Sequence, residues 1–600
     1  MAGVGGLHIY KQMAAIAGLA RRAYRPYKRE IAALTGLSLV GGILEGVGVN
    51  AVIPLLTFAL DLQIPATDIL SQAIQTLFTW AHVPFVPRYL LAFIVILFMG
   101  KALMTLLIGV ISIRITTEYE RNTRSKLFSK VMGASWPYLL KQKLGNLETL
   151  LMVDTPASMS LLVKISFTIT ILTSLLMYLL VAFSISSIVT FATLMLGMLI
   201  FTTLRPLLDR VHGISRERAT LYRDTVHHVT EHVGGLKTVK ALGAENAAVA
   251  RGEGLFSSIK GLTRRIQYRQ QFAAQAVAPI GVLYIAAILA LAFKTPFISL
   301  AALPSILYLI YRIFTYVQQL QNNVQYMSEL APHLERVVLY ESEAEAGAGV
   351  PSGDKPFRFD TALSFENVSF AYEEGRDVLH NISFKIPKGT MVGIVGPSGA
   401  GKTTCVDLML RLLTPRRGAI TLDGASSKDI SLSEWRRSVA YVSQDFFLMQ
   451  DTIRNNIRFY DETISDEEIW EAAQQAHINE FIRKSPKGLD TMVGERGIQL
   501  SAGERQRITI ARALARKPKL LILDEATSAL DNESEAHIKR VIEELKSKVT
   551  IVAIAHRLST IMGSDSLVVL SGGRVVEEGS PKALLADTSS YFYKVYTISQ

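Results

Sequence analysis

The chain has 600 residues, of which 49% are hydrophobic and 19% charged, and its mean hydropathy is +0.28. This composition excludes an ordinary soluble protein and predicts membrane spans, and the length is sufficient for two or more domains. The net charge of +11 arises in the first part of the chain, because residues 1–360 carry 33 Lys and Arg against 21 Asp and Glu while residues 361–600 carry 30 against 31.

The excess positive charge therefore accompanies the apolar part of the sequence. Basic residues that flank apolar spans are typical of cytoplasmic membrane loops, so nucleic-acid binding is the weaker explanation of the pI of 9.4. The single cysteine, Cys405, excludes an intrachain disulfide framework, and we expect it to be a buried helix residue.

The N-terminal residues 8–30 combine apolar side chains with six Lys and Arg. This basic amphipathic stretch predicts a helix that lies on an anionic inner leaflet, and the alternative is a solvated helix end. The N-terminus is too polar and too rich in arginine for a cleaved signal peptide.

Six apolar stretches follow, each long enough to cross the hydrocarbon core of a bilayer. They lie at 33–60, 88–113, 165–183, 186–204, 273–293 and 297–317. Residues 61–86 contain no Lys or Arg, whereas residues 114–164 and 205–271 are rich in both. The sequence therefore predicts six spans with both termini in the cytoplasm.

The two basic segments between spans are too long for simple loops. Their helical periodicity predicts that they continue the membrane helices into the cytoplasm. The second segment contains His227, His228 and His232, but no convergent Cys or carboxylate spacing, so we expect these histidines on a solvated helix face and not at a metal.

Apart from Arg88 at the start of the second span, three charged residues lie within the predicted spans: Glu45, Lys101 and Arg312. Glu45 and Lys101 fall at similar depths near the middle of the membrane, where a charge must face a partner or a water-filled cavity. One hypothesis is a Glu45–Lys101 ion pair that fixes helix packing. A second hypothesis is that Lys101 and Arg312 line a cavity and accept an anionic substrate head group. A third is that the charged side chains snorkel towards a membrane interface.

The composition changes at residues 341–358, which are small, polar and interrupted by Pro and Gly. This segment predicts a flexible linker between a transmembrane domain, residues 1–340, and a second domain, residues 359–600. Two predicted strands, 363–370 and 378–386, begin the second domain, which continues as a mixed α/β sequence typical of a nucleotide-binding domain.

A glycine-rich loop follows the apolar run 391–395 and precedes a helical pattern at 405–413. The loop consists of Gly396, Pro397, Ser398, Gly399, Ala400, Gly401, Lys402, Thr403 and Thr404. A strand, a loop of this pattern and a helix allow backbone N–H groups to converge on phosphate oxygens. We expect Lys402 to reach the β- and γ-phosphates and Thr403 to hold Mg²⁺.

A second motif places two carboxylates after the apolar strand 520–523. Open α/β sheets bind ligands at the carboxyl ends of their strands, where Asp524 suits the Mg²⁺ shell and Glu525 suits the polarisation of an attacking water. Phosphoryl transfer needs positioning and charge neutralisation, so a lysine, Mg²⁺ and an oriented water are the required parts.

The segment Leu500-Ser-Ala-Gly-Glu504-Arg-Gln-Arg507 resembles the signature motif of ATP-binding-cassette (ABC) proteins. Six spans followed by one cassette resemble an ABC exporter half-transporter over essentially the whole chain. The resemblance implies an all-α six-helix transmembrane domain and an α/β P-loop cassette with an antiparallel β subdomain and a helical subdomain. It also implies that ATP and Mg²⁺ are bound.

Further cassette residues match the family in order and spacing. By resemblance, Tyr372 stacks on adenine, Gln444 touches Mg²⁺ and senses the membrane domain, Asp531 lies in the loop that crosses the dimer interface, and His556 is the switch histidine near the γ-phosphate. Glu525, His556 and Lys402 are accordingly the predicted catalytic residues.

The signature motif implies a dimer, because Ser501, Gly503 and Glu504 of one cassette would face the phosphate held by the loop of the other. Ala502 stands where the family usually has Gly, and Glu504 where it usually has Gln, which affects the expected hydrolysis rate but not ATP binding. The complete catalytic set favours a homodimer, and the altered signature leaves a heterodimer as the alternative.

Other segments indicate the direction of transport. Residues 491–497 resemble a segment typical of exporters, and residues 136–154 and 235–245 resemble exporter loops that dock on the cassettes. The first helix, at 45–59, is similar to that of bacterial lipid-linked oligosaccharide flippases, although a multidrug or peptide exporter fits almost as well.

We therefore expect an ATPase in a bacterial inner membrane that moves an amphipathic substrate out of the cytoplasm or inner leaflet by alternating access. The substrate could be a lipid, a lipid-linked saccharide, a drug or a peptide. The alternatives are an ATP-gated channel or sensor on the same scaffold, and a soluble ABC ATPase of nucleic-acid repair or translation, which six apolar spans exclude.

Overall fold

The computed structural model describes residues 18–59, 69–142, 144–292, 303–346, 349–373, 375–524, 532–546, 548–554 and 561–597. The chain divides into two compact units, Met1–Ala134 with Lys141–Gly347 and Ser135–Leu140 with Ala348–Gln600. The first unit is helical and the second combines two sheets with short helices.

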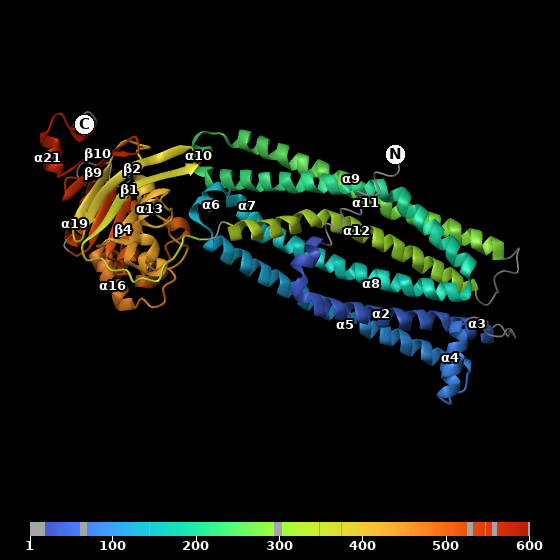
Figure 1. Ribbon diagram of the computed structural model, residues 1–600. Coiled ribbons are helices and arrows are strands. Elements are labelled where there is room, and N and C mark those ends of the chain that lie inside the picture. Colours follow the sequence, from blue (N-terminus) through green and yellow to red (C-terminus); the bar gives the residue numbers. More distant parts are fainter. Residues whose placement is uncertain are drawn as a thin grey trace. The chain divides into compact units, whose positions relative to one another are not determined.

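Long helices build the first unit, and they run side by side in Figure 1. They are α2 (Lys28–Asn50) with its continuation α3 (Val52–Ala59), α5 (Pro87–Gly133), α8 (Thr155–Ile185), α9 (Ser187–Gly234), α11 (Glu245–Ala292) and α12 (Leu303–Ala346). Shorter elements accompany them: η1 (Arg25–Tyr27), α4 (Ile69–Trp80), α7 (Leu144–Thr149), the π-helical turn η2 (Leu150–Asp154) and α10 (Leu236–Ala241). Helix α6 (Trp136–Lys141) belongs, except for its last residue, to the second unit.

Four of the described helical stretches are long and apolar enough to cross a membrane. They are Arg25–Phe58, Pro87–Gly133, Asn146–Ile185 and Glu245–Leu291, and α9 has a shorter apolar part, Ser187–Ile200. The predicted span 297–317 lies partly outside the described residues, which begin again at Leu303. The number of six spans therefore stays a prediction.

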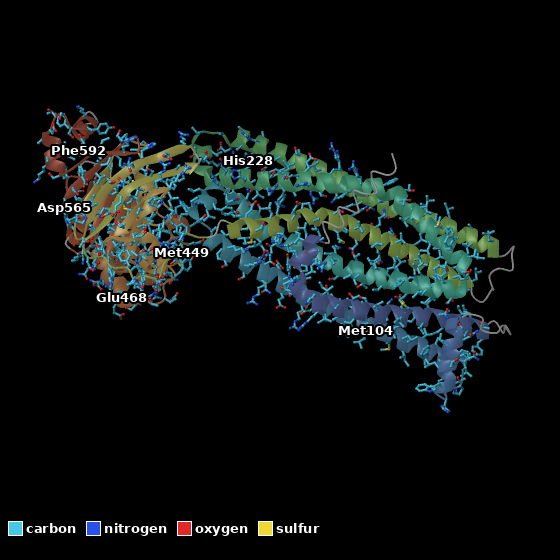
Figure 2. All side chains as sticks on the ribbon, viewed as in Figure 1. Met104, His228, Met449, Glu468, Asp565 and Phe592 are labelled. Carbon is cyan, nitrogen blue, oxygen red and sulfur yellow. The ribbon has the colours of Figure 1, made fainter. Side chains whose placement is uncertain are left out.

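The long helices continue well beyond the apolar stretches, as predicted for the basic segments. Helix α5 has 47 residues, which correspond to about 70 Å, whereas the hydrocarbon core is about 30 Å thick. In Figure 2 the side chains around Met104 are mostly carbon, while nitrogen and oxygen atoms are frequent around His228. Helix α5 thus changes from an apolar to a charged surface along its length.

The described part of the basic amphipathic stretch packs against neighbouring helices of the same unit. Tyr24 and Tyr27 are buried and pack edge-to-face on Tyr119 of α5, and the Tyr24 hydroxyl donates to the carbonyl oxygen of Ser158, 2.7 Å away. Arg21, Arg22 and Arg25 remain exposed. Its apolar face therefore packs on α5 and α8 and not on a lipid leaflet, and residues 8–17 lie outside the described part of the chain.

Helix α4 was not predicted from the sequence, in which no element was assigned to residues 61–86. Its buried residues Ile74 and Phe78 are one turn apart, and Phe78 contacts Phe85 and Phe93 edge-to-face. A pattern of only twelve residues does not clearly separate a short helix from a loop.

The predicted linker 341–358 begins later than expected, because α12 continues to Ala346. Residues 341–346 are Glu, Ser and Ala, and they contain no Gly or Pro. Glu and Ala are strong helix formers, so the run prolongs the helix up to the first glycine.

The second unit contains two sheets. The first is antiparallel, with the order β2-β1-β4-β5, and the second has the order β10-β9-β3-β8-β7-β6. The strands are β1 (Ala362–Glu373), β2 (Arg376–Pro387), β3 (Met391–Val395), β4 (Arg417–Leu422), β5 (Ala425–Ser426), β6 (Val439–Val442), β7 (Leu520–Asp524), β8 (Thr550–Ile554), β9 (Ser566–Ser571) and β10 (Arg574–Gly579). All neighbours in the second sheet are parallel except the edge strand β10.

The core of the second unit surrounds this parallel sheet. Every residue of β3, β7 and β8 is buried, which is typical of parallel strands with both faces covered. Besides α6, the helices of this unit are α13 (Lys402–Met409), α14 (Leu432–Ser438), α15 (Ile453–Arg458), α16 (Asp466–Gln475), α17 (Asn479–Lys484), α18 (Ala502–Leu514), α19 (Asn532–Leu545), α21 (Pro581–Ala586) and α22 (Tyr591–Thr597).

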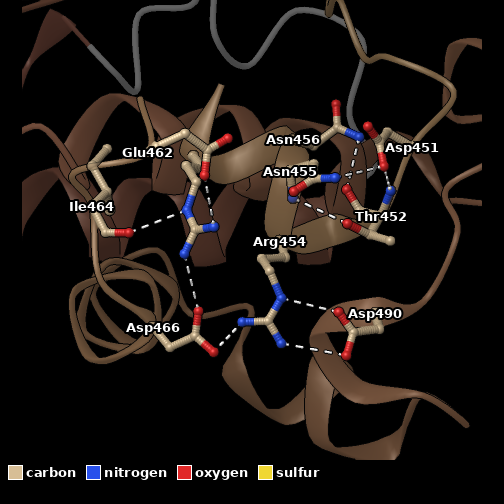
Figure 3. A network of polar contacts seen from close by, with 10 residues as sticks. Asp451, Thr452, Arg454, Asn455, Asn456, Glu462, Ile464, Asp466 and Asp490 are labelled. Carbon is tan, nitrogen blue, oxygen red and sulfur yellow. Dashed lines mark hydrogen bonds and ion pairs between the residues drawn. The ribbon is translucent and has the colours of Figure 1, made fainter. Parts of the chain in front are cut away.

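A network of ion pairs fixes α15 within the helical part of this unit (Figure 3). Arg454 binds both oxygens of Asp490, with Nε to Oδ1 at 3.0 Å, and also pairs with Asp466, which accepts from Arg458 at 3.2 Å. The hydrogen bonds that Arg454 donates to Asp490 and Asp466 raise its pKa. One arginine thereby joins α15 to α16 and to the turn at Asp490.

Candidate functional site

The phosphate loop connects β3 to α13, and its shape requires glycine at two positions. A Cβ on Gly396 would lie 2.2 Å from the carbonyl oxygen of Leu570. Gly401 has a φ of 99°, and a Cβ there would lie 2.5 Å from Leu379. The loop therefore packs closely on neighbouring backbone and side chains, and α13 begins directly after it at Lys402.

Lys402 points back into this loop and not into solvent. The residue is 7% exposed, and its Nζ donates to the carbonyl oxygens of Gly396 at 2.8 Å and Pro397 at 3.0 Å. Its charge is thus held where the loop N–H groups and the start of α13 converge, which is the arrangement that binds phosphate.

The other loop residues divide between the core and the surface. Thr403 is exposed at the first turn of α13, whereas Thr404 is buried and its hydroxyl lies 3.3 Å from the Tyr372 hydroxyl. Tyr372 itself is 40% exposed, so part of its ring is accessible beside the loop. The structure therefore brings the predicted adenine-stacking residue next to the phosphate loop.

Strands β3, β7 and β6 run in the same direction and end at the same edge of the sheet, where the phosphate loop follows β3. Strand β7 ends at Asp524, which is 7% exposed, and β6 is followed by Gln444. The Tyr441 hydroxyl donates to Oδ2 of Asp524 at 3.1 Å. Burial, together with the negative charge of Asp524, raises the pKa of Asp407 to about 6. Sequence reasoning missed Tyr441 and Asp407, because neither belongs to a recognised motif.

The donor set at this edge fits Mg²⁺. Thr403, Gln444 and Asp524 offer a hydroxyl, an amide oxygen and a carboxylate, and Mg²⁺ prefers oxygen ligands from few carboxylates completed by phosphate and water. The negative charge of the buried Asp524 carboxylate favours a cation at this edge. Among the described residues, no group of three or more His, Cys, Asp or Glu could hold a metal alone.

Several predicted site residues lie outside the described part of the chain: Glu525, Ser528, Asp531 and His556. Glu525 directly follows Asp524, and His556 comes two residues after the end of β8 at Ile554. Their predicted roles remain predictions.

The signature motif forms the N-terminus of α18. The Ser501 hydroxyl accepts from the N–H of Glu504 at 3.2 Å, and Oε2 of Glu504 accepts from the N–H of Ser501 at 2.8 Å, which is a complete capping box. Glu and Gln serve equally in this box, so Glu504 preserves the helix start. Gly503 is buried, and Ala502 packs partly on the core of the unit.

The intramembrane charges form a cluster that joins four helices. The carboxylate of Glu45, which is 2% exposed, pairs with Lys101 and with Arg312, the latter at 2.5 Å. Arg312 also donates to the hydroxyls of Tyr178 at 3.1 Å and Tyr316 at 3.2 Å. We call these five residues the Glu45 cluster. The predicted Glu45–Lys101 pair is confirmed, whereas Arg312 is bound to the same carboxylate and not free, and the tyrosines were missed.

The three histidines of α9 do not form a metal site in the described residues. His228 and His232 stack with ring centroids 3.9 Å apart, and Nδ1 of His232 lies 2.8 Å from the carbonyl oxygen of His228. The pKa of His228 is lowered by desolvation and by the neighbouring His232.

Two family models match the sequence. The model described as ABC transporter matches residues 379–528, and the model described as ABC transporter transmembrane region matches residues 52–295. The first match contains the phosphate loop and Asp524, and the second contains most of the long helices. The exporter architecture predicted from the motifs, a helical membrane region fused to one cassette, is therefore confirmed.

Known proteins resemble the chain over different lengths. The heterocyst differentiation ATP-binding protein HepA of Nostoc sp. is 30% identical over 579 residues, which cover 93% of this chain and 92% of that protein. An ATP-dependent lipid A-core flippase of Burkholderia thailandensis is 36% identical over 392 residues, and this alignment covers 64% of the chain and 65% of the flippase, less than two thirds of each.

A solved structure has the same architecture. It is a bacterial Atm1-family ABC exporter with ATP bound, which superposes with a TM-score of 0.77 at 25% identity over 96% of this chain and 98% of that one.

Proposed function

Because the chain belongs to the ABC transporter family, we propose that it is a half-transporter that hydrolyses ATP to export or flip an amphipathic substrate. The observation that carries this proposal is the convergence of the phosphate loop, Asp524 and Gln444 on one sheet edge in a chain that also contains long apolar helices. In this proposal residues 1–340 form the transmembrane domain, the linker ends at 358, and residues 359–600 form the cassette.

The ATP chemistry follows from the groups at that edge. Lys402 and the N–H groups of the loop bind and orient the phosphates, and the exposed face of Tyr372 stacks on adenine. Thr403, Gln444 and Asp524 hold Mg²⁺, which neutralises charge on the phosphates when bound. Glu525 orients the attacking water, and His556 contacts the γ-phosphate.

Half-transporter architecture implies a dimer, and we propose that the partner is a second copy of the chain. The N-terminus of α18, with Ser501 and Gly503, presents the Ser501 hydroxyl and the positive end of a helix, which suit a phosphate. Asp531 contributes to the same interface. Each ATP would then lie between the loop of one chain and the signature of the other.

The protein is an integral membrane protein, and we propose the bacterial inner membrane with cytoplasmic termini as its location. Helix α5 supports a lipid-facing position, because its apolar residues Leu91, Val95, Met99, Leu106 and Val110 are each more than half exposed. Such a surface is stable only against lipid or a partner.

ATP-dependent movement of labelled lipids in proteoliposomes tests the proposal. We expect the purified protein to translocate at least one class among lipids, lipid-linked saccharides, drugs and peptides, with a rate that falls to background in the Lys402→Ala variant. ATP hydrolysis without translocation of any class would contradict export. ATP-induced ion conductance with no uphill transport would support a channel instead.

A further inference from the structure

The inner part of α12 carries a stripe of polar side chains that are buried without partners. Gln321 is 1% exposed and Gln325 is 2% exposed. Both amide atoms of Gln321 and the Nε2 of Gln325 have no hydrogen-bond partner among the described residues. We call these two residues the amide stripe, since side chains four positions apart lie on the same face of a helix.

A third amide on the same helix behaves differently. Asn323 is 3% exposed, and its Nδ2 donates to the carbonyl oxygen of Lys164 at 2.9 Å and to the Thr168 hydroxyl at 2.8 Å. Asn323 faces α8, whereas two residues along a helix correspond to a turn of about 200°, so the amide stripe faces the opposite side. The unsatisfied amides are therefore a property of one face of α12.

That opposite face is packed against α9 and α11. Glu329, one turn beyond Gln325, pairs with Arg218 of α9 and accepts from Nε2 of Gln270 of α11 at 3.3 Å. One turn before Arg218 lies Ser215, which is 2% exposed and whose hydroxyl also has no partner among the described residues. The seam between α9 and α12 thus contains polar groups from both helices.

These groups are costly in the arrangement described. A buried amide or hydroxyl without a hydrogen bond destabilises the arrangement, and an apolar residue of similar shape would avoid this penalty. Gln321, Gln325 and Ser215 each have a buried polar atom without a hydrogen-bond partner among the described residues. If α9 and α12 separated, these atoms could gain partners, and each new hydrogen bond would stabilise the separated arrangement. The buried polar groups of the seam are therefore those expected of a surface that is exposed in another state of the transport cycle.

We propose that the seam is a binding face for the hydroxyl-rich head group of the substrate, such as the sugar of a glycolipid, and is exposed when α9 separates from α12. An amide supplies a donor and an acceptor side by side, which matches neighbouring hydroxyls. Among the described residues that line the seam, the charge of Glu329 is compensated by that of Arg218, so the amides are its uncharged polar groups. This inference rests on the proposed export function and names its substrate class.

The test replaces the amides by leucine, which removes hydrogen bonding and keeps the volume. Fluorescent monoglucosyl diacylglycerol and phosphatidic acid are the two probes, and their ATP-dependent translocation is measured in proteoliposomes with the full chain. In Gln321→Leu and Gln325→Leu we expect the ratio of glycolipid to phosphatidic acid translocation to fall about tenfold, while the Tm stays equal or rises. The variant Gln321→Asn, which keeps an amide, should recover part of the ratio.

Two control variants on the same helix make the result specific. Gln319→Leu introduces the same chemical change at a partly exposed position outside the stripe, and its ratio should equal that of the wild type. Asn323→Leu removes an amide that has partners, and it should lower the Tm. A drop in Tm for Gln321→Leu with an unchanged ratio would show that the amides serve packing only, which overturns the inference.

The two proposals fail in distinguishable ways. A wild-type protein that translocates phosphatidic acid but not the glycolipid overturns the glycolipid site and leaves export intact. A wild-type protein that translocates neither probe, nor any other class, contradicts export itself and with it the inference.

Discussion

The phosphate loop and the Glu45 cluster both hold charged groups away from water, but they are built in opposite ways. Lys402 is positioned by a run of nine consecutive residues, and its partners Gly396 and Pro397 belong to that run. Glu45 is positioned by side chains from α5, α8 and α12, and Arg312 is 267 residues away along the chain. A contiguous motif carries its geometry with it, whereas the cluster exists only after the helices have packed.

The largest expected effect comes from breaking the long-range cluster. Glu45→Gln removes the only carboxylate that Lys101 and Arg312 contact among the described residues, and leaves two partly buried cations close together. Removing one partner of a buried pair costs about 3–5 kcal/mol. We expect a marked fall in the Tm measured in detergent.

The matched variant is Lys101→Met, which leaves the pair between Arg312 and Glu45. Its effect on the Tm should be clearly smaller. The charge swap Glu45→Lys with Lys101→Glu should not restore stability, because it places Lys next to Arg312. Full rescue by this swap would show that Arg312 is not part of the cluster.

The variant Glu525→Gln tests the proposed catalytic role of a residue that belongs to a contiguous motif. Lys402 and the loop N–H groups still bind the phosphates in this variant, while the attacking water loses its orienting base. We expect ATP affinity within about twofold of the wild type and at least a hundredfold slower hydrolysis. Hydrolysis above about a tenth of the wild-type rate would remove Glu525 from the mechanism.

The sequence predicted those parts of the molecule whose geometry is local. The loop from Gly396 to Thr404, the strand that ends at Asp524 and the continuation of α5 beyond the membrane follow from patterns within short windows. Tyr441 could not be predicted as a partner of Asp524, because only the parallel pairing of β6 with β7 places the two side by side.

The start of the linker was predicted incorrectly from the sequence. Composition alone predicted a boundary at Glu341, but the helix propensity of the Glu and Ala residues carried α12 to Ala346. Helix α4 was not predicted, because its amphipathic pattern is only about three turns long. Boundaries and short helices depend on packing that a sequence pattern does not record.

A third prediction concerns Asp423, whose carboxylate accepts hydrogen bonds from the backbone at the start of β1 in the cassette. Its Oδ1 accepts from the Thr361 hydroxyl at 2.6 Å, from the Thr361 N–H at 2.7 Å and from the Ala362 N–H at 2.9 Å. Burial opposes the charge, but these hydrogen bonds prevail and lower the pKa of Asp423. A lowered pKa in the folded state stabilises the protein above the unfolded value of about 3.9, and this contribution is lost as the pH falls through the folded pKa.

We therefore expect Asp423→Asn to lower the free energy of unfolding by about 1 kcal/mol at pH 7, since the site is largely exposed and screened. The difference from the wild type should shrink below pH 4, which calorimetry at both pH values measures. A difference that is constant with pH would mean that the carboxylate charge has no part in the effect.

The smallest expected effect is that of Ala502→Gly in the signature helix. Ala502 occupies the first helical position after Ser501 and packs partly on the core, so glycine costs about 0.5–1 kcal/mol of helix stability. Against this, the missing methyl opens the backbone surface that approaches the phosphate of the other cassette. We expect ATPase activity between the wild-type rate and about twice that rate, because the capping box of Ser501 and Glu504 does not involve the Ala502 side chain. A loss of activity greater than about fivefold would mean that the methyl packing orients the signature, and Ala502 would then be a positioning residue and not a brake on hydrolysis.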